Sequence, residues 1–88
     1  MTKPEVVFHY VKAVHPLDDF ILLVEFDNHE IRYYDVKQCF DRWPVFRQLK
    51  ENPDLFYGVK NEEIGVVFTD DIDLACGELY WGGRKEKY

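Results

Sequence analysis

The strongest pattern in the chain is a pair of hydrophobic segments on either side of a short polar turn. The segments cover residues 20–26 and 31–36, and the polar residues 27–30 separate them. Two segments rich in β-branched and aromatic residues around such a turn predict a β-hairpin. Both faces of the first segment are largely apolar, so we expect a central strand that is covered on both sides over at least its first half.

The turn of this hairpin has no glycine at the position where one is usual. Asn28 and His29 stand there instead, and both residue types tolerate a left-handed backbone better than most others do. We therefore expect a positive φ at one of these two residues.

Further strands are predicted where β-branched and aromatic residues cluster between turn-forming residues. They cover residues 6–14, 59–61 and 65–68. Together with the hairpin, these segments predict one small twisted antiparallel sheet of about four or five strands.

Apolar residues at three- and four-residue spacing predict a helical region in the middle of the chain. Pro44 divides it into a short turn near 37–41 and a helix from about 44 to 50, because proline disfavours helix at the residue before it. Asp73 is placed as the N-cap of a last short helix over 73–80. The fold class is thus α+β, with helices on one face of the sheet. The side chains expected to pack on that face are Phe40, Trp43, Phe46 and Leu49.

The length of 88 residues predicts a single domain over residues 1–88, with residues 81–88 as a flexible tail. A domain of this size has a thin core, and the aromatic content of 17% is high for it. We expect some of these rings at a contact surface, where Tyr and Trp are enriched.

The net charge of −6 opposes the phosphate attraction on which most nucleic-acid binding depends. Residues 61–83 contain no Lys or Arg. This acidic stretch fits a solvated face, and the alternative is a docking patch for a basic protein. The candidate partner-binding residues are Glu62, Glu63, Asp70, Asp71, Tyr80 and Trp81.

The two cysteines, Cys39 and Cys76, stand in apolar surroundings without the density of a disulfide scaffold. Buried free thiols are the usual state of such residues, so we expect a reducing, cytoplasmic location. The chain shows no signal-peptide pattern and no apolar stretch of the ~18 residues that a membrane span needs.

No residue pattern predicts a catalytic or metal site. Asp70, Asp71 and Asp73 offer oxygen ligands, but turn formation and helix capping explain all three. His9 and His15 lack further ligands at a suitable spacing. We assign no catalytic residue, metal ligand or cofactor.

Two other polar groups have a structural interpretation. Cys39 would be a nucleophile only if a neighbouring base or helix terminus depressed its pKa. Asp35 ends a predicted strand just before the helical region, where its carboxylate can cap backbone N–H groups.

The order of several short motifs resembles that of the prokaryotic family catalogued as domain of unknown function 2442. The motifs are Phe-Asp-Asn at 26–28, Asp-Val at 35–36, Asp-Leu-Ala at 73–75 and Leu-Tyr at 79–80. The resemblance covers about residues 11–80. It implies a small α+β domain without an established activity, and it implies association with toxin–antitoxin-type gene pairs or, in other members, an appended DNA-binding domain.

Two residues depart from the pattern of that family. His29 stands where the family usually has glycine, and Phe68 where it often has tryptophan. Because the sequence ends at Tyr88, we expect no appended DNA-binding domain here.

Two functional hypotheses remain open. The first is a non-enzymatic protein-interaction module, in its finer form the antitoxin-like partner of a small basic protein. The second is a small-molecule-binding or accessory metabolic domain that uses Asp35, His15 and Asp73. Homodimerisation through an uncovered edge strand is compatible with either.

Overall fold

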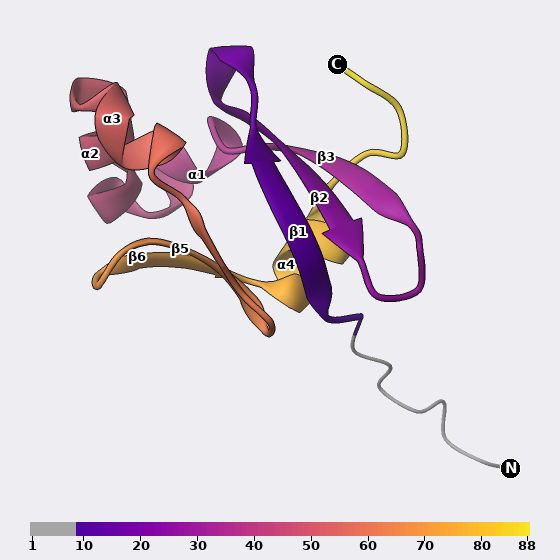
Figure 1. Cartoon of the computed structure of the whole chain (residues 1–88). Helices are drawn as coiled ribbons and strands as arrows, with labels where there is room; N and C mark the ends of the chain where they lie inside the picture. The colour runs from indigo at the N-terminus through magenta and orange to yellow at the C-terminus, as the bar shows by residue number, and fades with distance from the viewer. Residues whose placement is uncertain (1–8) are drawn as a thin grey trace, which may run out of the picture.

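The chain folds into two three-stranded antiparallel sheets that are connected by short helices (Figure 1). The structure is a computed structural model, and it describes residues 9–88. The α+β class is confirmed, whereas the strands form two small sheets instead of one sheet of four or five strands. The strands of the first sheet are β1 (Val11–Pro16), β2 (Ile21–Phe26) and β3 (Ile31–Asp35), and those of the second are β4 (Lys60–Glu62), β5 (Gly65–Thr69) and β6 (Ile72–Ala75).

The predicted hairpin consists of β2 and β3, and its first strand is the centre of the first sheet. Strand β2 lies between β1 and β3 and pairs with both in antiparallel register. Leu22 and Val24 are fully buried, while Leu23 on the opposite face is half-buried. Strand β1 begins at Val11, and the part of the predicted strand at residues 6–8 lies outside the described residues.

His29 adopts a φ of 70°, as the missing glycine predicted. The Asn28 side chain accepts a hydrogen bond from the Glu30 amide at 3.1 Å and thereby holds the turn. Asn28 itself keeps a negative φ, so the left-handed residue of the turn is His29.

The helical region between the two sheets consists of several short pieces. They are α1 (Gln38–Arg42), the 3-10 turn η2 (Pro44–Phe46), α2 (Arg47–Glu51) and α3 (Pro53–Tyr57). Pro44 and Pro53 each open a piece, a position where the missing N–H costs nothing. The first three pieces match the prediction, and the short helix α3 was not predicted.

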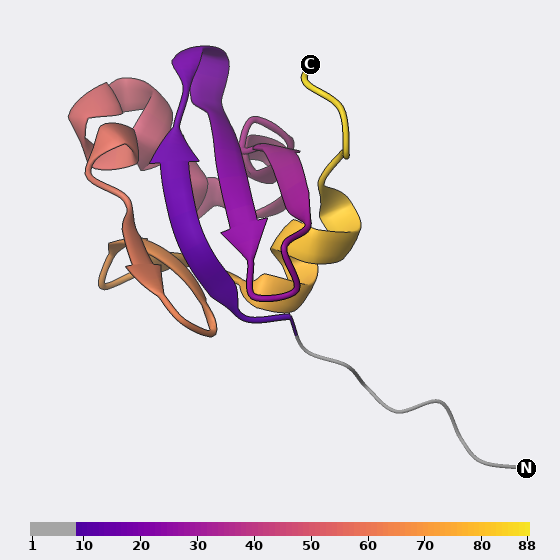
Figure 2. The ribbon, with the colours of Figure 1, turned by 45° about the vertical axis from the view of Figure 1, so that its right-hand side comes forward.

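The last predicted helix is shorter than expected, and Asp73 does not cap it. Residues 72–75 form strand β6, and helix α4 runs over Cys76–Gly82 with Ala75 at its N-cap. Buried Ile72 and Leu74 alternate with exposed Asp73 and Ala75, which is the two-residue period of a strand. Helix α4 then contacts β3 of the first sheet and β5 and β6 of the second, and Figure 2 shows it partly behind the lower end of the β2–β3 hairpin.

One hydrophobic core joins the two sheets and the helices. Leu22 of the hairpin and Phe46 of the helical region both belong to it, so these two segments pack in one core as expected. The assignment of Trp43 to the core is wrong, because its side chain is 39% exposed, and Phe40 is only partly buried. The fully buried side chains include Leu22, Val24, Phe26, Tyr34, Val36, Cys39, Leu49, Val66, Ile72 and Leu79.

Hydrogen bonds at the edges of β1, β3 and β4 join the two sheets and attach the C-terminal segment. The Val11 amide donates to the Glu63 carbonyl at 2.7 Å, and the Asn61 side chain donates to the Lys12 carbonyl at 2.9 Å, so β1 and β4 are joined. Tyr33 of β3 exchanges two backbone hydrogen bonds of 2.7 Å with Arg84. Part of the segment that was expected to be a flexible tail is therefore docked on the first sheet.

None of the helices between residues 9 and 88 is long and apolar enough to cross a membrane.

Replacing His29 with glycine is expected to stabilise the domain by about 0.5–1 kcal/mol. The substitution relieves the cost of a left-handed side-chain-bearing residue, and the entropy of the added glycine offsets part of that gain. Urea denaturation measures the difference. Asn28→Gly is the control, because it removes the hydrogen bond to Glu30 and should destabilise the fold; stabilisation by both variants would contradict this account of the turn.

Phe46→Ala is expected to cost ~3–5 kcal/mol because the Phe46 ring is 4% exposed and lies in the shared core. Trp43→Ala should cost only about 1–2 kcal/mol, since a large part of that ring is already in water. Equal losses in the free energy of unfolding from urea denaturation would show that Trp43 belongs to the core after all.

Candidate functional site

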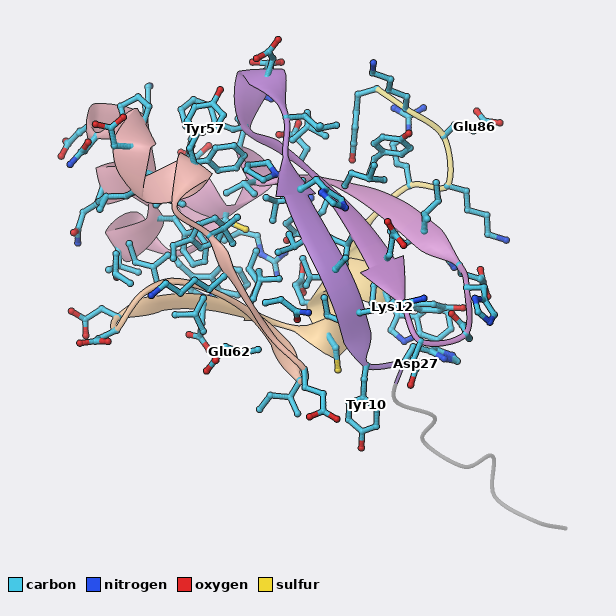
Figure 3. All side chains as sticks on the ribbon, viewed as in Figure 1. Tyr10, Lys12, Asp27, Tyr57, Glu62 and Glu86 are labelled. Atoms are coloured by element: carbon cyan, nitrogen blue, oxygen red, sulfur yellow. The ribbon has the colours of Figure 1, made fainter. Side chains whose placement is uncertain are left out.

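The predicted acidic residues do not form a single patch. Glu62 and Glu63 lie at the turn between β4 and β5, whereas Asp70 and Asp71 lie at the turn between β5 and β6. These turns are at opposite ends of β5, and Figure 3 shows Glu62 below the second sheet. All four side chains are exposed.

The two predicted aromatic residues differ in their surroundings. Trp81 is 77% exposed, while Tyr80 is only 8% exposed. The Tyr80 hydroxyl donates to the Glu30 carboxylate at 2.7 Å, and the His9 ring stacks on the Tyr80 ring at 4.4 Å. Tyr80 is thus a packing residue and has little surface to offer a partner.

A buried arginine completes the surroundings of Tyr80. The Arg32 guanidinium lies 4.2 Å from the centre of the Tyr80 ring and 2.9 Å from the Glu30 carboxylate. Hydrogen bonds from Tyr80 and then from Arg32 hold the pKa of Glu30 below its ordinary value. Glu30, Arg32 and Tyr80 are thus each in contact with another member of the cluster. We therefore interpret the cluster as structural: it attaches the β2–β3 hairpin to helix α4.

A groove beside β6 brings together residues that are far apart in the sequence. Its volume is about 420 Å³. Side chains from the α1–η2 segment form one wall, and β6 with the start of α4 forms the other. Its apolar residues are Trp43, Val45, Phe46, Leu74 and Ala75, and its carboxylates are those of Asp71, Asp73 and Glu78.

Pro44 is the local cause of the apolar wall. Trp43 precedes it and has an extended backbone with φ −133° and ψ 103°, as proline imposes on the preceding residue. Helix α1 therefore ends at Arg42, and the Trp43 ring turns outward beside Phe46, with 5.7 Å between ring centres. The Arg42 guanidinium covers part of the Trp43 ring at 4.3 Å.

Glu78 connects the groove to the core. Its carboxylate accepts a hydrogen bond of 2.7 Å from the buried Tyr34 hydroxyl and lies 3.3 Å from the Arg42 guanidinium. Burial, with the hydrogen bonds to Cys39 and Glu78 next, raises the pKa of Tyr34 far above its ordinary value. The Glu78 carboxylate is thus held in place by the neutral Tyr34 hydroxyl and by the positively charged Arg42 guanidinium.

Cys39 has no nucleophilic character in this setting. Its thiol is fully buried, and burial raises its pKa above the usual range. Cys76 is likewise buried and free, so both cysteines are free thiols as predicted.

The polar groups of the small-molecule hypothesis lie apart from one another. Asp35 accepts a hydrogen bond from the Lys37 amide at 3.0 Å, as expected, but the N-cap of α1 is Lys37. His15 lies 3.4 Å from Glu25 in the first sheet, while Asp73 lies in the second. Within residues 9–88, no cluster of three or more His, Cys, Asp or Glu side chains is arranged to hold a metal ion.

The fold and the groove define a small α+β domain with an apolar, acid-rimmed groove at the edge of one sheet. The model of the family described as "Protein of unknown function (DUF2442)" matches residues 11–85. The chain belongs to this family, which confirms the resemblance found in its motifs. No curated protein and no solved structure matches the chain.

Sequence analysis missed Trp43 and Glu78 as groove residues. The Trp43–Pro44 pair could have predicted the exposed ring, because the residue before a proline is disfavoured in a helix. Glu78 carried none, since its place depends on Tyr34, which is 44 residues away along the chain.

The stability of the domain is expected to fall as the pH rises above about 10, the ordinary pKa of tyrosine. Above that pH the unfolded chain loses a proton at Tyr34 that the folded protein keeps, so the unfolded state gains stability with increasing pH. Tyr34→Phe should unfold with a weaker dependence on pH in this range, from a starting stability ~1 kcal/mol lower because a buried hydrogen bond is lost.

Urea denaturation below and above this pH measures the effect. Tyr57→Phe is the control, because it removes a tyrosine hydroxyl from a side chain that is half exposed instead of buried. An unchanged pH dependence in Tyr34→Phe would contradict the burial of the Tyr34 hydroxyl.

Proposed function

We propose that the domain is a non-enzymatic protein-binding module whose groove beside β6 takes a basic segment of a partner protein. The observation that carries the proposal is the combination of a partly exposed tryptophan with three carboxylates in one groove. Exposed aromatic rings in concave sites supply much of the affinity in protein interfaces. Carboxylates at such a site select a positively charged partner.

The charges around the groove favour a basic partner. Asp71 and Asp73 have no ion-pair partner within residues 9–88, and Glu78 is the one groove carboxylate that contacts an arginine. A smaller depression of about 200 Å³ shares Asp73, Leu74 and Ala75 with the groove and adds Glu62. The net charge of −6 further speeds the encounter with a cationic protein.

The finer form of the proposal is an antitoxin-like role. A small basic toxin-like protein has the charge that this groove favours, and gene pairs of that kind are what the family resemblance implies. A second copy of the same chain is a poorer occupant, because its acidic surface would meet the same carboxylates.

Tryptophan fluorescence tests the groove directly, because the chain has only two tryptophans. The probe is a short peptide of alternating arginine and valine residues, named here the arginine–valine peptide. In Trp81→Phe, where Trp43 is the remaining tryptophan, the peptide should shift the emission to shorter wavelength as the ring loses contact with water. A response only in Trp43→Phe, which keeps Trp81, would place binding elsewhere and contradict the proposal.

Charge reversal supplies the matched control. Asp73→Lys should weaken binding of the arginine–valine peptide by about tenfold, the equivalent of ~1.4 kcal/mol. Asp27→Lys changes the net charge equally but lies in the hairpin turn of the first sheet (Figure 3), and it should have a small effect. Equal weakening by both variants, or equal binding of a glutamate–valine peptide, would show that the groove is not the site.

A further inference from the structure

The outer edge of β6 is the edge that lies along the groove. In the second sheet β5 lies between β4 and β6, so β4 and β6 are its edge strands. Strand β4 is joined to β1 through Val11 and Glu63, and the edge of β3 in the other sheet meets Arg84. Within residues 9–88, no strand pairs with the outer edge of β6.

The register shows which backbone groups face this edge. The Cys76 amide donates to the Ile64 carbonyl at 2.8 Å, on the side of β5. Residues of an antiparallel strand direct their N–H and C=O groups alternately to the two sides. Leu74, two residues before Cys76, therefore faces β5, and Asp73 and Ala75 face the open edge.

The groove follows this edge and not one face of the sheet. Asp73, Leu74 and Ala75 all line it, although Leu74 points into the core while its two neighbours are exposed. No residue of β5 lines this groove, whereas the smaller depression of about 200 Å³ is lined by Gly65, Val66 and Val67 as well. The groove therefore lies on the side of β6 that faces away from β5. The opposite wall, with Trp43 and Phe46, stands beside the unpaired backbone groups.

We propose that the partner's basic segment binds as an added β-strand on the outer edge of β6. This inference rests on the proposed function and specifies its binding mode. The backbone of the segment pairs with Asp73 and Ala75, since an exposed edge of this kind is a template for an extended peptide. Alternate side chains of the segment then point to opposite faces.

The two sides of the groove specify the sequence of the segment. The core side presents Trp43, Phe46 and Leu74, and the outer side presents the Asp73 carboxylate. A strand laid between them places every second side chain against apolar rings and the others near carboxylates. The partner is thus an extended segment in which basic and apolar residues alternate.

Ala75→Pro tests the added strand while preserving the fold. Ala75 has a φ of −72°, which proline adopts without strain, and the lost N–H faces the open edge. Leu74, the preceding residue, is already in a strand as proline requires. The variant should keep or raise its melting temperature and bind the arginine–valine peptide about tenfold more weakly. Ala75→Ser, which also changes the side chain but retains the N–H, is the matched variant and should bind the peptide more tightly than Ala75→Pro does.

The outcomes separate this inference from the proposed function. If Ala75→Pro binds the peptide as tightly as Ala75→Ser while Asp73→Lys loses binding, the groove is the site but strand addition is overturned. If neither Ala75→Pro nor Asp73→Lys changes binding, both proposals fall.

A second measurement leaves the protein unchanged and so does not depend on the folding of a variant. N-methylation of every second residue of the peptide blocks hydrogen bonding along one edge of its backbone. Methylation on one of the two alternate sets should weaken binding strongly and on the other set weakly. Equal binding of both methylated peptides would overturn strand addition.

Discussion

The rest of the structure depends on the core that the two sheets share. A sheet of three short strands cannot bury a hydrophobic face by itself, so each sheet needs the other and the helices between them. Leu22 and Phe26 of the first sheet, Phe46 of the helical region and Leu74 of the second meet in this core. The junction of β1 with β4 closes one side of the assembly. The core therefore fixes the inner face of β6, and its outer edge remains beside the groove.

Pro44 gives that open edge a second wall. By ending helix α1, Pro44 turns the Trp43 ring away from the core and toward β6, while Phe46, three residues after Trp43, returns to the core. The core also positions the acidic end of the groove, because the buried Tyr34 hydroxyl holds Glu78. An apolar wall and a fixed carboxylate thus come from the same packing that stabilises the fold.

The features that depend on neighbouring residues could be predicted from the sequence. The hairpin, the left-handed His29 and the break at Pro44 follow from turn chemistry and spacing. The way in which the two sheets meet depends on the contact of Val11 with Glu63, which no local pattern encodes. Strand β6 is four residues long, too short for its alternation to be told from a turn of helix. The groove could not be predicted from the sequence, because the position of Glu78 in it depends on Tyr34, which is 44 residues away along the chain.

The central claim is that the backbone of β6 is unpaired on its outer edge and that a basic partner segment pairs there. Hydrogen exchange at the amides of residues 73–75, followed by NMR, tests it most directly. We predict that the Leu74 amide is protected in the free protein, and that the amides of Asp73 and Ala75 exchange rapidly until saturating arginine–valine peptide protects them. Protection of Ala75 in the free protein, or exchange that the bound peptide leaves unchanged, would contradict the account.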